Sequence, residues 1–117
     1  EGTQTRSFCY VDDLINGLYG VMNNPDVYNE PLNLGNPTEF TIKELAYKIL
    51  QLTQSKSNVI NKKLPNDDPK QRQPNIDNIQ IQIDWKPHIQ LEEGLIKTIN
   101  YFKGQLKQDK WFWSLKK

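Results

Sequence analysis

The chain has 117 residues, 36% hydrophobic and 25% charged, and its 15 Lys plus Arg against 14 Asp plus Glu give a formal net charge of +1. These values predict one soluble globular domain with a small core, and they exclude the strong basic excess on which non-specific nucleic-acid binding depends. No apolar run reaches the roughly 18 to 20 residues of a membrane-spanning helix, and the N-terminus does not have the form of a signal peptide.

Cys9 is the only cysteine of the chain and His88 its only histidine. One cysteine excludes an internal disulfide, and this pair lacks the ligand pattern of a structural zinc site. We therefore expect no metal site and a reducing compartment, the cytoplasm. The chain begins with Glu1 and its one methionine, Met22, is internal, which indicates a piece of a longer protein.

The first predicted elements are a strand and a helix. Aromatic and β-favouring residues fill positions 5–11, which predicts a strand. Asp12 and Asp13 follow it and indicate the start of a helix. They are expected to serve as N-cap and first-turn carboxylates, which stabilise the helix by about 1 kcal/mol. Apolar residues then recur at helical spacing until Asn23-Asn24-Pro25 ends the pattern: Leu14, Ile15, Leu18, Val21 and Met22.

A short strand candidate at 31–34 is followed by the turn residues Gly35 and Pro37. Thr41 and Glu44 have the spacing of a capping box, so a helix is expected to begin there. Its apolar face consists of Ile42, Leu45, Ala46, Ile49 and Leu52. Another strand candidate covers 58–61.

Residues 64–74 contain three prolines and no apolar periodicity, which predicts an irregular loop. The segment 76–83 fits both a strand and a helix, but Asp77 as N-cap and Trp85-Lys86-Pro87 as a stop favour a short helix.

The last helix is expected to fray toward 116–117. Its apolar stripe follows Glu92 and Glu93 and consists of Leu91, Leu95, Ile99, Phe102 and Leu106.

These elements predict an α/β to α+β segment of about four helices with short strands. Arg6 and Arg72 are its candidate ligand-binding residues, because one enters a strand, the other lies in a loop between prolines, and a guanidinium binds phosphate oxygens bidentately. From the residues alone, a surface or ion-pair arginine is nevertheless the favoured interpretation of each.

The other chemistry-bearing residues have simpler interpretations. Cys9 is expected to be a buried structural cysteine and His88 a surface histidine, and Asp67-Asp68 a solvated turn rather than a metal or acid–base pair. Trp111-Phe112-Trp113 is expected to be a helix end packing on neighbouring protein, with a base-stacking platform or an interfacial anchor as alternatives.

Five segments can be compared with known sequence patterns: QTRSFCYVDDL at 4–14, LNLGNP at 32–37, DDPKQRQP at 67–74, WKP at 85–87 and LEEGL at 91–95. Together they resemble the C-terminal third of UDP-glucuronic acid decarboxylase, or UDP-xylose synthase, of the extended short-chain dehydrogenase/reductase family of NAD-dependent epimerases and dehydratases. The YVDDL and W-x-P pieces are shared across that group, whereas QTRSF with DDPKQR is typical of the decarboxylase.

The resemblance implies a lyase reaction of nucleotide-sugar metabolism. The C4 hydroxyl of UDP-glucuronate is oxidised with NAD, the β-keto acid loses CO2, and return of the hydride gives UDP-xylose. This chain has no G-x-x-G-x-x-G phosphate loop and no Tyr-x-x-x-Lys pair. The resemblance therefore implies that the cofactor and the catalytic residues belong to a missing N-terminal Rossmann domain, and that the 117 residues alone are inactive.

What the resemblance carries over is the substrate side. It implies that Arg6 and Arg72 contact the UDP-sugar and that Gln4 and Thr5 border the same site. Residues 1–104 are expected to form the nucleotide-sugar-binding region, and 105–117 a basic aromatic helix end or tail. The partners are expected to be UDP-glucuronate or UDP-xylose, the enzyme's own Rossmann domain and a second copy in a homodimer, with neither nucleic acid nor membrane.

Two alternatives remain, namely the C-terminal part of another nucleotide-sugar 4-epimerase or 4,6-dehydratase, and a non-catalytic interaction module. The chain also departs from the family at two positions. Asp84 stands where relatives commonly have glycine, and Gln90 where they have serine. Each departure is expected to weaken a helix cap rather than the substrate site.

Overall fold

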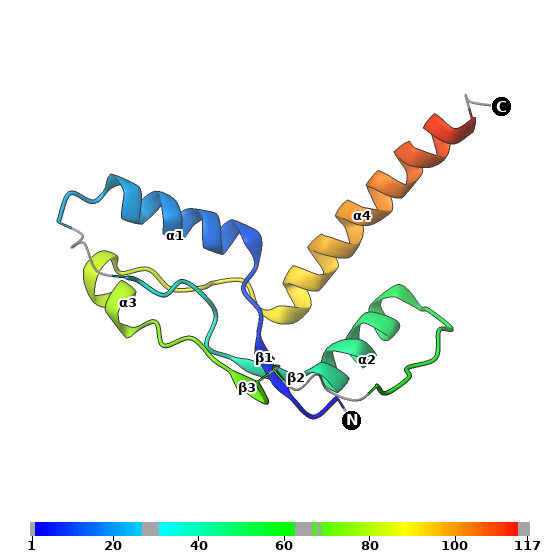
Figure 1. The fold of residues 1–117 in the computed structure, drawn as a ribbon. Helices are drawn as coiled ribbons and strands as arrows, with labels where there is room; N and C mark the ends of the chain where they lie inside the picture. Colours follow the sequence, from blue (N-terminus) through cyan, green and yellow to red (C-terminus); the bar gives the residue numbers. More distant parts are fainter. Residues whose placement is uncertain (1, 27–30, 63–66, 68, 115–117) are drawn as a thin grey trace.

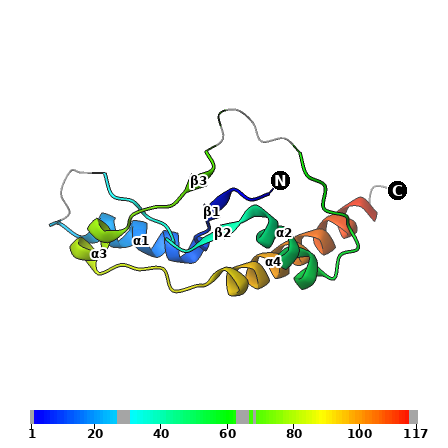
Figure 2. The same cartoon turned by 90° about the horizontal axis from the view of Figure 1, so that it is seen from below.

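The computed structural model describes residues 2–26, 31–62, 67 and 69–114. The described residues form three strands and four helices, and the predicted fold class is confirmed. The small sheet lies in the middle, α1 and α3 lie together at one end, and α2 and α4 at the other (Figures 1 and 2). The bounds are Thr5–Ser7 (β1), Val11–Asn23 (α1), Glu39–Thr41 (β2), Ile42–Thr53 (α2), Gln71–Arg72 (β3), Asp77–Ile83 (α3) and Leu91–Ser114 (α4).

The sheet has the order β2-β1-β3, so β1 is its central strand. β2 runs antiparallel to β1 with Arg6 opposite Phe40, and β3 runs parallel to β1 with Arg6 beside Arg72. β3 consists of two exposed residues and lies on the edge of the sheet. The expectation of an irregular loop at 64–74 is therefore wrong at 71–72, and residues 63–66 and 68 lie outside the described part.

The two strand candidates at 31–34 and 58–61 are wrong, because neither segment is paired with another strand. Leu32 and Leu34 lie in an irregular segment, and their partly buried side chains pack against the core. Val59 and Ile60 are exposed. A short apolar run becomes a strand only where another strand satisfies its backbone groups, and propensity alone cannot supply that partner.

Helix α2 begins with the predicted capping box. The Thr41 hydroxyl accepts a hydrogen bond from the Glu44 backbone N–H at 3.0 Å, and the Glu44 carboxylate accepts one from the Thr41 backbone N–H at 2.7 Å. This bond to the Thr41 backbone, followed by one from its hydroxyl, lowers the pKa of Glu44. The reciprocal pair satisfies two backbone donors that a helix start leaves open.

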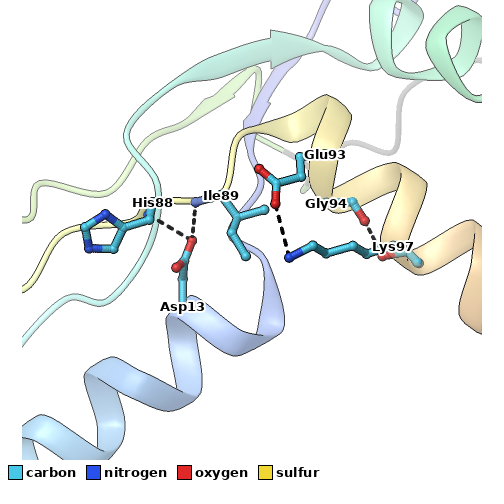
Figure 3. Close-up of polar contacts among 7 residues, drawn as sticks. Asp13, His88, Ile89, Glu93, Gly94 and Lys97 are labelled. Carbon is cyan, nitrogen blue, oxygen red and sulfur yellow. Dashed lines mark hydrogen bonds and ion pairs between the residues drawn. The ribbon is translucent and has the colours of Figure 1, made fainter.

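Helix α1 begins at Val11, with Tyr10 as an N-cap residue that provides no side-chain hydrogen bond. Asp12 and Asp13 lie in the first turn as expected, but neither is the N-cap residue. Asp13 also has a role that was not expected, because it is 4% exposed. Its carboxylate accepts from the backbone N–H groups of His88 at 3.0 Å and Ile89 at 2.8 Å (Figure 3). Asp13 therefore holds the segment that leads into α4 against the start of α1.

The core lies between α1 and α3. Ile76, Ile79 and Trp85 form its buried cluster, and the Trp85 indole N–H donates to the Asp13 carbonyl at 3.1 Å. Gly17 of α1 lies against this indole, because a Cβ at Gly17 would stand 2.9 Å from Trp85 Nε1. The absence of a side chain lets the helix and the tryptophan approach closely.

The segment 76–83 is a helix as predicted, but its cap differs from the prediction. Asp77 is the first helical residue rather than the N-cap, and its backbone N–H donates to the Asn75 side chain at 2.8 Å. The helix ends at Asp84, whose φ of 51° is left-handed. This is the position where the family resemblance led us to expect glycine.

Helix α4 follows the predicted apolar stripe and continues to Ser114. Leu91 at its start is buried, whereas Phe102 and Leu106 are exposed. The expected fraying at 116–117 lies outside the described residues. No helix among the residues described has both the length and the apolar character needed to cross a membrane.

We predict that Asp84→Gly stabilises the chain. The left-handed conformation at position 84 strains any residue with a Cβ, so glycine should raise the free energy of unfolding by about 0.5–1 kcal/mol. A thermal melt measures this, and Asp84→Ala, which keeps a Cβ and loses the polar side chain, should lower Tm. Equal Tm values for the glycine and alanine variants would contradict the prediction.

Asp13→Ala should destabilise the chain by about 2–4 kcal/mol, because two partly buried backbone N–H groups lose their acceptor. Urea unfolding measures the change. Asp12→Ala is the matched control, since Asp12 is exposed in the same helical turn, and it should cost no more than about 0.5 kcal/mol. Similar losses in the two variants would show that both carboxylates act only on the helix dipole.

Candidate functional site

Arg6 and Arg72 meet at one cavity of the structure. They are paired positions of the parallel strands β1 and β3, so their side chains leave the same face of the sheet. Both line an open cavity of about 450 Å³. The pairing of two strands far apart in the sequence thus places two permanent positive charges beside one space.

Three stretches of chain make up the cavity walls. One is β1 with the start of α1, another is the turn at 33–36, and the last is β3 with the residues after it. The lining residues are Arg6, Ser7, Cys9, Leu14, Asn33, Leu34, Gly35, Asn36, Arg72, Gln73, Pro74 and Asn75. None of these described lining residues is acidic, so the cavity suits an anionic ligand with polar groups.

Side-chain amides join the walls to each other. Asn33 Nδ2 donates to the Asn75 carbonyl at 3.2 Å, and Gln73 Nε2 donates to the Pro37 carbonyl at 2.7 Å. The buried Asn36 side chain accepts from the Thr38 backbone N–H at 2.9 Å and shapes the turn. These bonds hold the turn at 33–36 and the segment 73–75 at a fixed separation.

Gly35 marks the closest approach of these two walls. A Cβ at this position would lie 2.8 Å from Cγ of the Pro74 ring. Real Cβ atoms essentially never come that close to another heavy atom, so any side chain here would push the walls apart.

Gln4 and Thr5 are next to Arg6 in the sequence but do not line the cavity. The Gln4 carbonyl accepts from the Ile42 backbone N–H at 3.1 Å, and the Thr5 hydroxyl donates to Glu39 at 2.7 Å. Both residues therefore hold β1 in the sheet. The structure brings Arg6 and Arg72 together at the cavity, whereas Gln4 and Thr5 do not line it.

Cys9 lines the cavity, but its chemistry is that of a structural residue. It lies between β1 and α1, outside the strand in which it was expected, and is half-buried. Burial, followed by the negative charge of Asp13, raises the pKa of its thiol. A raised pKa keeps the sulfur protonated, and the thiol is a poor nucleophile.

The remaining predicted residues lie elsewhere. The His88 and Asp67 side chains are exposed, as expected for surface positions. Asp68 and the side chains of Trp111, Phe112 and Trp113 lie outside the described residues. Within the described part of the chain, no group of His, Cys, Asp and Glu could hold a metal ion.

Sequence reasoning missed the four amides of the cavity, Asn33, Asn36, Gln73 and Asn75. A signal was present, because the chain has 12 Asn and 10 Gln, and these four lie within or beside two of the recognised motifs. Polar amides are common on any surface, however, so composition could not select these four.

The comparisons with known proteins agree with the geometry. UDP-glucuronic acid decarboxylase 1 of Danio rerio is 46% identical over 105 residues, which are 90% of this chain and 25% of that protein. No protein-family model matches the chain. The chain thus spans about a quarter of the length of the curated relatives that it matches, and its resemblance to UDP-glucuronic acid decarboxylase is confirmed over that part.

Solved structures of epimerases share the fold. An epimerase of Methanothermobacter thermautotrophicus superposes with a TM-score of 0.88 and 27% identity, covering 92% of this chain and 32% of that one. The UDP-glucuronic acid 4-epimerase of Bacillus cereus, in complex with UDP-glucuronic acid and NAD, gives 0.80 and 25%, covering 90% and 34%. The fold is that of the C-terminal fragment of such enzymes.

Gly35→Ala should deform the cavity. The added methyl must displace Pro74, a rigid ring, and we expect a loss of about 1–3 kcal/mol in the free energy of unfolding together with faster amide exchange at 73–75. Gly104→Ala is the matched control, because a Cβ there meets nothing within 4 Å and removal of a helical glycine should stabilise the chain. Unchanged exchange at 73–75 would show that the walls tolerate the methyl.

Proposed function

We propose that this chain is the nucleotide-sugar-binding segment of an NAD-dependent UDP-glucuronate decarboxylase, a lyase that makes UDP-xylose and CO2. The observation that carries the proposal is the pairing of Arg6 with Arg72 on one cavity face. The similarity to decarboxylases over 90% of the chain supports the choice of reaction. Because the chain covers about a quarter of those enzymes, it supplies part of their machinery.

In this proposal Arg6 and Arg72 bind the diphosphate of the UDP-sugar. A diphosphate brings about two negative charges, and hydrogen bonds to charged groups contribute roughly 1.5–3 kcal/mol each. The amides of Asn33, Gln73 and Asn75 surround the arginines and offer donors and acceptors to the polar remainder of the ligand. Gln4 and Thr5 border the site and support it through the pairing of β1.

The chemistry of the sugar belongs to the rest of the enzyme. NAD supplies hydride transfer when it is bound, but the described residues do not fit this cofactor. Gly17 and Gly20 lie inside α1, and Gly17 is covered by Trp85 and Leu34, so they form no phosphate-binding loop. We therefore place NAD and the catalytic residues in a Rossmann domain outside this chain, and we propose that the 117 residues alone do not turn over.

An exposed apolar face supports this division. Val11, Ile15 and Met22 follow one another at helical spacing along α1 and are all more than half exposed. Tyr101 and Phe102 of α4 are also exposed and line a second cavity beside the start of α1. We propose that the cofactor domain covers this face in a complete enzyme, which acts as a homodimer in the cytoplasm.

A 4-epimerase is the second candidate, because the superposed structures include epimerases and one holds UDP-glucuronic acid. The two candidates share the substrate and differ in the product. Incubation of the complete enzyme with UDP-glucuronate distinguishes them, since the decarboxylase releases CO2 and the epimerase releases none.

Arg72→Lys in the complete enzyme tests the binding role. Lysine keeps the charge but loses the planar fork that binds two oxygens at once, so kcat/KM for UDP-glucuronate should fall by the equivalent of about 1–3 kcal/mol, and by more in Arg72→Ala. Arg6→Lys should behave similarly.

Lys70→Ala is the matched control, because Lys70 is an exposed cation two positions from Arg72 and does not line the cavity. Its kcat/KM should change by no more than about 0.5 kcal/mol. Thermal melts of all variants exclude unfolding. Near-wild-type kcat/KM for Arg72→Ala would remove this residue from the site.

A further inference from the structure

Glu39 joins all three strands of the sheet through its side chain. It lies on β2, where its carboxylate accepts from the Thr5 hydroxyl of β1 at 2.7 Å. The other carboxylate oxygen accepts from Gln71 Nε2 of β3, also at 2.7 Å. Each oxygen therefore holds a different strand, and one side chain spans the sheet from β2 to β3.

This bridge lies on the back of the site. Thr5 is paired with Gln71, and the next pair along the strands is Arg6 with Arg72. Successive residues of a strand point to opposite faces, so the Glu39 bridge occupies one face and the two arginines occupy the other, cavity-lining face.

β3 is a short strand, and the side-chain bond just after it, from Gln73 Nε2 to the Pro37 carbonyl at 2.7 Å, does not reach β1. It consists of two exposed residues on the sheet edge, and the backbone bond that ties its start to β1 runs from the Thr5 N–H to the Lys70 carbonyl at 3.0 Å. A slip of one residue along β1 would turn Arg72 to the opposite face and bring a glutamine beside Arg6, because the side-chain period of a strand is two.

We infer that Glu39 is a positioning residue, which fixes the register of β3 by binding Thr5 and Gln71 and thereby sets Arg72 beside Arg6 at the cavity. The inference rests on the proposed function for the meaning of the arginine pair. The residue that fixes the register of β3, Glu39, does not itself line the cavity.

Amide hydrogen exchange on the 117-residue chain, without ligand, tests the register. Glu39→Ala and Gln71→Ala should each speed exchange of the Thr5 N–H by about tenfold, and the double variant should add little, because both changes break one bridge. Glu92→Ala, which removes an exposed ion pair with Lys48, is the control and should leave Thr5 unchanged. Protection of Thr5 within about twofold of wild type in Gln71→Ala would overturn the inference.

UDP binding, measured by calorimetry, connects the register to the ligand. Arg72→Ala should weaken UDP binding by about tenfold or more in the wild-type background and only slightly in the Gln71→Ala background, where Arg72 has already lost its position. If Gln71→Ala only destabilised the chain and left Arg72 in place, Arg72→Ala would weaken UDP binding by the same factor in both backgrounds. Losses of about tenfold or more that are equal in both backgrounds would therefore overturn the inference even if Thr5 exchange responds.

The same measurements separate this inference from the proposed function. If UDP binding is insensitive to Arg72→Ala while Thr5 exchange still responds to Glu39→Ala, the proposed function fails and the control of register stands. If Glu39→Ala unfolds the chain, Glu39→Gln retains one acceptor oxygen and should give intermediate Thr5 exchange. Wild-type exchange in Glu39→Gln and in Gln71→Ala would overturn the inference.

Discussion

The Asp13 carboxylate accepts hydrogen bonds from two successive backbone N–H groups, those of His88 and Ile89, and the rest of the fold depends on this contact. It joins the first turn of α1 to the segment that leads from the core into α4. The Trp85 indole N–H binds the carbonyl of the same aspartate and lies against Gly17. One buried residue thereby places the tryptophan, the start of α4 and the wall of the cavity that α1 contributes through Leu14.

The cavity depends on a second constraint, which is the register of a very short sheet. Two arginines side by side would repel each other, and their proximity therefore has to be imposed by the backbone. The pairing of β1 with β3 provides this, and the amides of Asn33 and Gln73 hold the opposite walls. If the cavity binds a diphosphate as proposed, this arrangement exists before the ligand binds, which reduces the ordering cost of binding.

The chain exposes more apolar surface than a small independent domain needs. The outer face of α1 bears large exposed hydrophobic side chains, with Met22 at 83% exposure, and so does α4 at Tyr101, Phe102 and Leu106. Contiguous apolar faces of this kind are typical of interfaces. The similar decarboxylases are about four times as long as the matched region, so they contain ample chain to cover such a face.

The sequence by itself determined the helices and the recognisable motifs, because these depend on neighbouring residues. The capping box of Thr41 and Glu44 follows from local spacing, and so does the short helix before Trp85-Lys86-Pro87, although its cap at Asn75 and its end at Asp84 were not predicted. Only the tertiary structure decided that β2 and β3 are strands, that Asp13 binds the backbone at 88–89 and that four amides line the cavity. Each of these features requires a partner distant in the sequence, and a pattern read along one segment contains no information about that partner.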